Sequence, residues 1–257
     1  MSAKKDSFGK TVGVVVAVCL VCSIVVSGAA VGLREIQQEN KKLDKQTNIL
    51  TAAGLYESGM NSDQVASVYD EKIERRFVDL ETGEFTEKPG GEGAEYDMYK
   101  AAKQSEMSKT VEDSNVGFQR RANVASVWLV KDESDTVTRV ILPVHGSGLW
   151  ALMYGFLAVD ADGKTIKELI YYEQAETPGL GGEVQNPNWQ KLWDGKKLYD
   201  NGEVAIDVTK GADPSDPYEV DALSGATLTS NGVENTIRYW AGEQGFGPFL
   251  KNQAWRS

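Results

Sequence analysis

The most pronounced feature of the hydrophobic pattern is an uncharged, mostly apolar run from Thr11 to Leu33. As a helix, its 23 residues would measure about 35 Å, enough to cross a hydrocarbon layer of about 30 Å. A cleaved signal peptide has a shorter apolar core, although the small residues of 27–30 resemble a cleavage site and keep that alternative open. The pattern therefore predicts a single transmembrane helix near the N-terminus.

Basic residues lie on both sides of this run, three lysines before it and Arg34 with three lysines after it. The lysines before the run belong to a short tail, which stays in the cytoplasm more readily than a large domain does. We therefore expect residues 1–33 to be a cytoplasmic tail and membrane span. The large domain would lie outside the inner membrane of a bacterium, in the periplasm.

Residues 34–123 show mixed patterns. A mostly polar helical pattern runs from Arg34 to about Tyr56, and a second one, capped by Asn61 or Ser62, to about Arg76. Residues 77–80 are typical of a strand, and residues 96–109 of a short helix. We interpret 34–123 as a helical stalk and an elaboration ahead of the main domain.

Strand patterns dominate from Val124 onward. Apolar runs cover 125–130, 138–144, 150–159 and 165–172, with a turn-forming sequence at 160–163 between the last two. A final strand is expected at 203–208, and Asn186 is placed to cap a short helix before it. The order of elements predicts an α+β fold with an antiparallel sheet in a domain spanning 124–257.

A last helical pattern appears at Val233, Ile237 and Trp240. Asn231 is placed to cap it, with Glu234 as the capping-box partner. The stretch just before it, 224–230, holds four hydroxyl side chains and a glycine. A hydroxyl-rich loop at a helix N-terminus is suited to a phosphate group, because free backbone N–H groups and the helix dipole meet there.

Composition excludes some kinds of ligand and metal site. The formal net charge is −11, so the chain is a poor partner for nucleic acid. The only cysteines, Cys19 and Cys22, lie inside the apolar run, and His145 is the single histidine. A zinc site built from cysteines or several histidines is thus excluded from the rest of the chain.

Three glycine-containing loops remain as candidate ligand contacts: 145–150, 176–182 and 224–227. None has the sequence of a phosphate-binding P-loop or of a nicotinamide-binding Rossmann turn. The last two read E-T-P-G-L-G and S-G-A-T, the latter preceded by Asp221.

These two motifs, in this order and behind a membrane span, resemble the FMN-binding domain family. The resemblance covers essentially the whole chain and is strongest to the C subunits of sodium-translocating NADH:quinone reductases. It implies that Thr227 carries FMN covalently, through a phosphoester that a flavin transferase forms from FAD. Thr229 is a nearby rival hydroxyl, but Thr227 matches the final threonine of the motif.

The resemblance also implies roles for the residues around Thr227. Asp221, Ser224, Gly225 and Ala226 belong to the motif that the transferase reads. The flavin ring is expected to lie against Glu176, Thr177, Gly179, Leu180 and Gly181. We consider Trp150, His145 and Lys210 as further contacts, each with a structural alternative: a core aromatic, a strand-capping histidine and a solvated lysine.

The function so implied is electron relay, between redox centres of a multisubunit membrane complex, by a subunit without an NADH site of its own. Three alternatives stay open. They are the flavoprotein subunit of the ferredoxin-linked Rnf complex, a non-redox anchored ligand-binding or assembly module, and a hydrolase that uses Ser224 or Ser147 with His145. The hydrolase is disfavoured because no G-x-S-x-G sequence is present.

Overall fold

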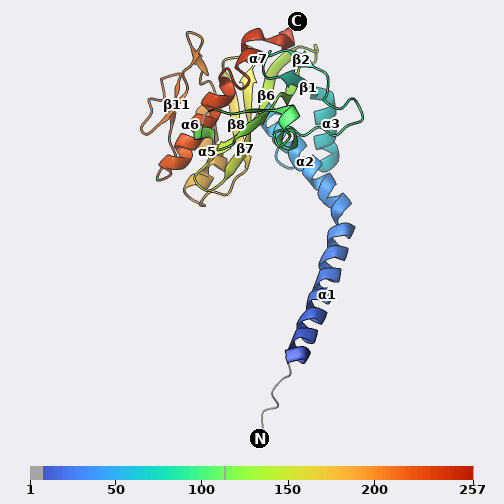
Figure 1. Ribbon diagram of the computed structural model, residues 1–257. Helices are drawn as coiled ribbons and strands as arrows, with labels where there is room; N and C mark the ends of the chain where they lie inside the picture. The colour runs from blue at the N-terminus through green and yellow to red at the C-terminus, as the bar shows by residue number, and fades with distance from the viewer. Residues whose placement is uncertain (1–7, 113, 257) are drawn as a thin grey trace. The chain divides into compact units, whose positions relative to one another are not determined.

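The computed structural model describes residues 8–112 and 114–256, so most of the predicted cytoplasmic tail lies outside the described residues. The chain divides into two compact units, one up to Lys45 and one from Gln46 onward. Figure 1 shows the elements of both.

The first unit is helical. Helix α1 covers Phe8–Gly32, and α2, Arg34–Ala53, begins in this unit after a turn at Leu33. Among the described residues, α1 is the one helix long and apolar enough to cross a membrane. Its side chains are exposed along its whole length, as expected for a helix whose apolar surface faces lipid. The predicted N-terminal anchor is therefore supported, with the helix starting slightly before the uncharged run.

An antiparallel sheet forms the centre of the second unit (Figure 1). Its strand order is β2-β1-β5-β6-β7-β8, and every neighbouring pair is antiparallel. The strands are β1 Ile73–Asp79, β2 Phe85–Thr86, β5 Val124–Lys131, β6 Val137–Ser147, β7 Leu152–Asp160 and β8 Ile166–Glu173. The predicted α+β class with an antiparallel sheet is confirmed, including the turn at 160–163 between β7 and β8.

Both faces of this sheet are buried. Along β5, Val127 and Leu129 belong to the main core cluster, whereas the alternate residues Trp128 and Val130 are buried outside it. Alternate residues of a strand point to opposite faces. Two apolar layers therefore cover the sheet, which explains why its strands are almost continuously apolar.

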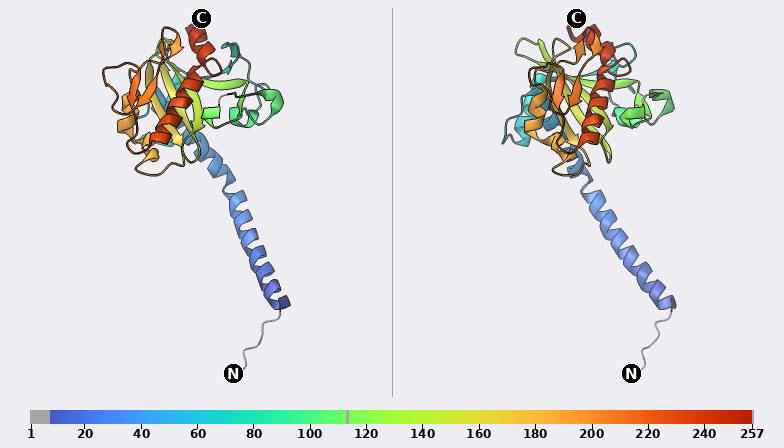
Figure 2. Two further views of the ribbon diagram at one scale, coloured as in Figure 1. Left: turned by 60° about the vertical axis from the view of Figure 1, so that its left-hand side comes forward. Right: turned by 90° about the vertical axis from the view of Figure 1, so that its left-hand side faces the viewer.

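Helix α6 covers one face, and the C-terminal part of α2 together with α3 lies on the other (Figure 2). Helix α3, Ser62–Lys72, begins with a capping box in which Asn61 and Gln64 bond each other's backbone N–H groups. The helix ends at Lys72, earlier than predicted, because every residue from Ile73 to Asp79 pairs with β5. Segment 34–123 thus contributes β1 to the central sheet.

The predicted helix at 96–109 is confirmed only in its first part. Only α4, Met98–Ala101, is α-helical there, followed by a 3₁₀ turn at Ser105–Met107 and strand β3, Ser108–Thr110. Strand β3 pairs with β4, Arg120–Ala122. Backbone pairing with a strand a little further along the chain outweighs the local helical pattern at the end of this segment.

Short elements follow β8. They are the 3₁₀ turn Gly181–Gln185, α5 Pro187–Gln190, the 3₁₀ turn Lys191–Trp193, β9 Tyr199–Asp200, β10 Glu203–Val204, β11 Asp207–Thr209 and β12 Glu219–Asp221. Asn186 caps α5 as predicted, by accepting the N–H of Asn188. The single strand predicted at 203–208 is instead divided between β10 and β11, and β11 pairs in parallel with β12.

Helix α6 covers Thr227–Ala241 and starts four residues before the predicted cap. Asn231 and Glu234 lie inside it, so the predicted capping box does not form. Its close packing depends on glycines: a Cβ on Gly232 would stand 2.1 Å from the Ser147 carbonyl oxygen. Helix α6 thus packs closely against the end of β6. The last α-helix is α7, Gly247–Asn252.

Candidate functional site

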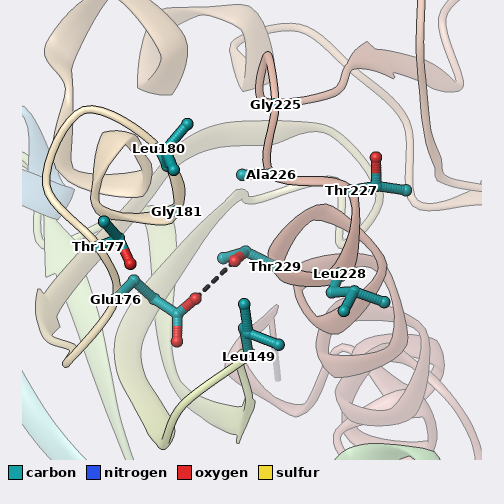
Figure 3. Close-up of a pocket in the computed structure, with 10 residues that line it drawn as sticks. All are labelled: Leu149, Glu176, Thr177, Leu180, Gly181, Gly225, Ala226, Thr227, Leu228 and Thr229. Atoms are coloured by element: carbon teal, nitrogen blue, oxygen red, sulfur yellow. Dashed lines mark hydrogen bonds between the residues drawn. The ribbon is translucent and has the colours of Figure 1, made fainter.

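The loops after β6 and β8 meet the N-terminus of α6 at a cavity of about 240 Å³. Figure 3 shows its lining side chains. They are Leu149, Glu176, Thr177, Leu180, Gly181, Gly225, Ala226, Thr227, Leu228 and Thr229. Each of the three glycine-containing loops identified in the sequence therefore contributes lining residues to this cavity.

Glu176 joins the three segments. One carboxylate oxygen, Oε1, accepts the backbone N–H of Trp150 at 2.9 Å, and the other, Oε2, accepts the hydroxyl of Thr229 at 2.5 Å. The side chain is only 6 % exposed. A buried carboxylate needs such donors, because an unpaired one would be strongly disfavoured.

Glycines make room for this carboxylate. A Cβ at Gly148 would lie 2.5 Å from Glu176 Oε1, and one at Gly181 would lie 2.7 Å from Oε2. Gly148 of the 145–150 loop and Gly181 of the 176–182 loop therefore both leave space for the same buried side chain. Gly225 has a different requirement, a φ of 72°, which favours glycine.

Large apolar side chains stand exposed around the cavity. Leu149, Leu180 and Leu228 are 47, 43 and 61 % exposed, and Trp150 beside them is 69 % exposed. Trp150 Nε1 donates to the Thr177 hydroxyl at 3.3 Å. Trp150 is thus not a core aromatic. Apolar surface beside polar loop groups suits a flat aromatic ligand with a polar edge.

Within residues 8–112 and 114–256, no side chain caps the N-terminus of α6. Ala226 occupies the N-cap position and supplies no acceptor, so the first-turn amides of Thr227, Leu228 and Thr229 lack a capping partner. Thr227 is exposed at the first helical position. An exposed hydroxyl beside uncapped N–H groups fits a phosphate ester.

The four hydroxyls of this stretch have different environments. Thr229 and Ser230 are each 1 % exposed. Thr229 donates to Glu176, and Ser230 donates to the Ala226 carbonyl and accepts the Leu223 N–H. Ser224 and Thr227 are exposed. Of the two exposed hydroxyls, only that of Thr227 lies on the helix and lines the cavity.

Asp221 and Lys210 lie outside the lining. The exposed Asp221 carboxylate accepts the backbone N–H of Gly211 at 2.7 Å, which connects the loop after β11 to the end of β12. Lys210 is an exposed residue of that loop. Gly179 is likewise exposed and has a φ of 74°, so it shapes the turn of the 176–182 loop.

His145 lies in the core among the rings of Tyr99, Phe118, Tyr154 and Trp240. Desolvation lowers its pKa to about 3. Within the described residues, its Nδ1 has no hydrogen-bond partner, and Ser147 Oγ donates instead to the Gly148 carbonyl. A serine hydrolase would need an accessible Ser–His hydrogen bond, which this arrangement does not provide.

Sequence reasoning missed Leu149 and Leu228 as lining residues and treated Thr229 only as a rival to Thr227. Leu149 and Leu228 directly adjoin motif residues, but their exposure follows from the loop conformations. The pairing of Thr229 with Glu176 joins positions 53 residues apart, and no local pattern signals it.

Comparison with known proteins agrees with this geometry. A model of the FMN-binding domain family matches residues 148–242, which include the whole cavity lining. The C subunit of the Na⁺-translocating NADH-quinone reductase of Yersinia pestis is 50 % identical over 250 residues, 96 % of this chain and 93 % of the relative. The corresponding protein of Vibrio alginolyticus is 52 % identical over 254 residues, 97 % and 96 % of the two chains.

Solved structures give the same result. The crystal structure of Shewanella oneidensis NqrC, 33 % identical, superimposes with a TM-score of 0.76 and covers 83 % of this chain and 98 % of that one. The crystal structure of the C subunit of the Na⁺-translocating NADH-quinone reductase from Parabacteroides distasonis is 29 % identical and superimposes with a TM-score of 0.66. It covers 85 % of this chain and 96 % of that one. These relatives do not favour the Rnf protein or a non-redox module. The chain belongs to the family of C subunits of Na⁺-translocating NADH-quinone reductases.

Proposed function

We propose that this chain carries FMN as a phosphoester on Thr227 and relays electrons within a Na⁺-translocating NADH-quinone reductase. The observation that carries the proposal is the setting of Thr227, an exposed hydroxyl on an uncapped helix N-terminus at the wall of the cavity. Membership of the family indicates FMN as the cofactor, and the setting of Thr227 supports this residue as its attachment point.

The cavity residues would hold the two ends of the cofactor differently. The first-turn amides of α6 would bind the phosphate, because they are uncapped N–H donors at the positive end of the helix dipole. Leu149, Leu180 and Leu228 would cover the apolar ring, and the backbone of 177–181 would meet its polar edge. When bound, FMN supplies the capacity to accept and donate electrons.

The ester has a physical rationale. A single threonine hydroxyl contributes too little by hydrogen bonding to retain a flavin, whereas a covalent bond prevents its loss. We further propose that the large unit lies in the periplasm, where retention matters because no pool of free flavin can be assumed. The basic tail before α1 supports that orientation.

Other proteins complete the proposed function. A flavin transferase would attach the FMN, and the exposure of Asp221, Ser224, Gly225 and Thr227 supports access by such an enzyme. Other subunits of the reductase would deliver and receive the electrons. Thr227 lines the same cavity as the exposed side chains of Leu149, Leu180 and Leu228, so maturation and electron transfer would both use this region.

The direct test is flavin attachment to the full chain. The chain is expressed with and without a flavin transferase, denatured and separated by electrophoresis, and the attachment residue is located by peptide mass spectrometry. We expect ultraviolet-excited fluorescence on the polypeptide only when the transferase is present, with the added FMN mass on Thr227.

Thr227→Ala should abolish that fluorescence, and Thr86→Ala serves as the matched control because Thr86 is an exposed threonine of β2. A fluorescent Thr227→Ala chain would exclude Thr227 as the attachment residue. A wild-type chain without flavin in the presence of transferase would refute covalent attachment altogether.

A further inference from the structure

The hydrogen bond between Thr229 and Glu176 lies next to the proposed attachment residue without including it. Thr229 occupies the third position of α6, and its hydroxyl donates to Glu176 Oε2 at 2.5 Å. In Figure 3 the Thr229 oxygen points to Glu176, whereas the Thr227 side chain points away from it. The two threonines of the first turn thus have opposite roles in the structure.

A helix start normally depends on a cap, and α6 has none at Ala226. Two buried hydroxyls anchor its first turn instead. Ser230 accepts the N–H of Leu223, which fixes the approach to the helix, and Thr229 bonds the 176–181 loop through Glu176. Anchoring through side chains at these positions leaves the N-terminal amides uncapped for a phosphate.

The surrounding contacts fit this role. Glu176 also accepts the N–H of Trp150, so one carboxylate connects α6 with two loops. A Cβ at Gly181 would stand 2.5 Å from Thr229 Oγ1, which shows how closely the pair is packed. Hydrogen bonds to a buried charged group are stronger than those between neutral groups, so this bond can hold the helix terminus in one position.

We propose that Glu176 and Thr229 are positioning residues for flavin attachment: their hydrogen bond replaces the missing cap, keeps the Thr229 hydroxyl inside and presents Thr227 to the transferase. This inference rests on the proposed function. In the reaction, the Thr227 oxygen forms a bond to the FMN phosphorus of FAD, and the phosphoanhydride bond to AMP breaks. AMP leaves with that electron pair, and the hydroxyl proton is released.

The test measures the rate at which purified flavin transferase labels the full-length chain with FMN from FAD, after expression of the chain without the enzyme. Thr229→Val removes the hydroxyl with little change in shape. We expect labelling to slow about tenfold, the factor that corresponds to losing roughly 1.4 kcal/mol of positioning. Thr229→Ser retains the hydroxyl and should label at the wild-type rate.

Thr236→Val is the matched control. Thr236 is another buried threonine of α6, and its hydroxyl donates to the Gly232 carbonyl within the helix at 2.7 Å. The change should reduce thermal stability without slowing the labelling of Thr227. Each variant's unfolding temperature is measured beside its labelling rate.

Three results would overturn the inference. They are a Thr229→Val chain that labels at the wild-type rate, equal slowing of the Thr229→Val and Thr236→Val chains, and FMN on Thr229 in a Thr227→Ala chain. If Thr229→Val fails to fold, Glu176→Gln provides the same comparison, because a neutral amide is a weaker acceptor than a carboxylate. A wild-type chain that is not labelled refutes the proposed function rather than this inference.

Discussion

Individual residues of this chain illustrate how burial changes chemistry. His145, the single histidine, is a candidate catalytic group by sequence, yet it lies within a cluster of aromatic rings and its pKa is lowered to about 3 by desolvation. The imidazole is therefore neutral in the folded chain at physiological pH, and its place is structural.

This shift predicts a pH dependence of stability. In the unfolded chain the histidine pKa is about 6.5, so below that pH the unfolded state binds a proton that the folded state does not. The contribution of neutral His145 to the free energy of unfolding is therefore complete above about pH 6.5 and is lost as the pH falls toward 3. Between pH 7 and pH 5 the loss should be about 2 kcal/mol.

Urea unfolding of the wild type and of His145→Phe at both pH values measures this loss. The carboxylates titrate in both chains, so the difference between them isolates the histidine. The substituted chain should lose about 2 kcal/mol less than the wild type between the two pH values. An equal loss in the two chains would contradict the assignment.

Two glycines likewise have roles that only the folded chain reveals. The sequence leads us to expect that the 145–150 and 176–182 loops contact a ligand, and the structure gives their glycines Gly148 and Gly181 another role, which is to leave space for the Glu176 carboxylate. The sequence identified the correct residues because the motifs are specific. It did not reveal the internal contact, because Glu176 reaches these glycines only after the loops have folded together.

Among the elements, those with strong local signals were predicted well. The apolar strands of the sheet, the turn at 160–163 and the cap at Asn186 were all located within a few residues. Errors occurred where tertiary contacts decide a boundary. Helix α3 ends where pairing of β1 with β5 begins, and α6 begins early because its first turn packs against the neighbouring loops.

The two asparagines proposed as caps provide a test at this scale. Asn61 forms a capping box with Gln64, so Asn61→Ala should destabilise the chain by about 1 kcal/mol. Asn231 is an exposed residue inside α6, so Asn231→Ala should change stability by less than about 0.5 kcal/mol. Denaturant unfolding of both variants measures the difference. A larger cost for Asn231 would restore it as a functional cap.

At the scale of the whole molecule, α1 and the larger unit have separate physical requirements. Helix α1 is apolar along its length and long enough to cross a membrane, whereas the second unit has its own sheet and core. The acidic balance of the chain, −11 overall, keeps the second unit soluble and disfavours binding to nucleic acid.

The proposed orientation predicts protease access. In intact spheroplasts, external protease should digest the second unit and leave a small fragment containing α1, because the large unit would face outward. A cytoplasmic protein measured in the same sample should remain intact until the membrane is lysed. Full protection of the second unit before lysis would place it in the cytoplasm and refute the orientation.

The sequence by itself determined the long apolar N-terminal helix, the fold class and the motif residues at the proposed site, since these depend on local hydrophobicity, strand periodicity and specific short sequences. Only the tertiary structure decided which hydroxyls are available. Four hydroxyls occur between Ser224 and Ser230, and two of them are buried and hydrogen-bonded. Thr229 pairs with Glu176, which is 53 residues away in the sequence. Such burial and pairing arise from packing of the whole unit, so no local sequence pattern predicts them.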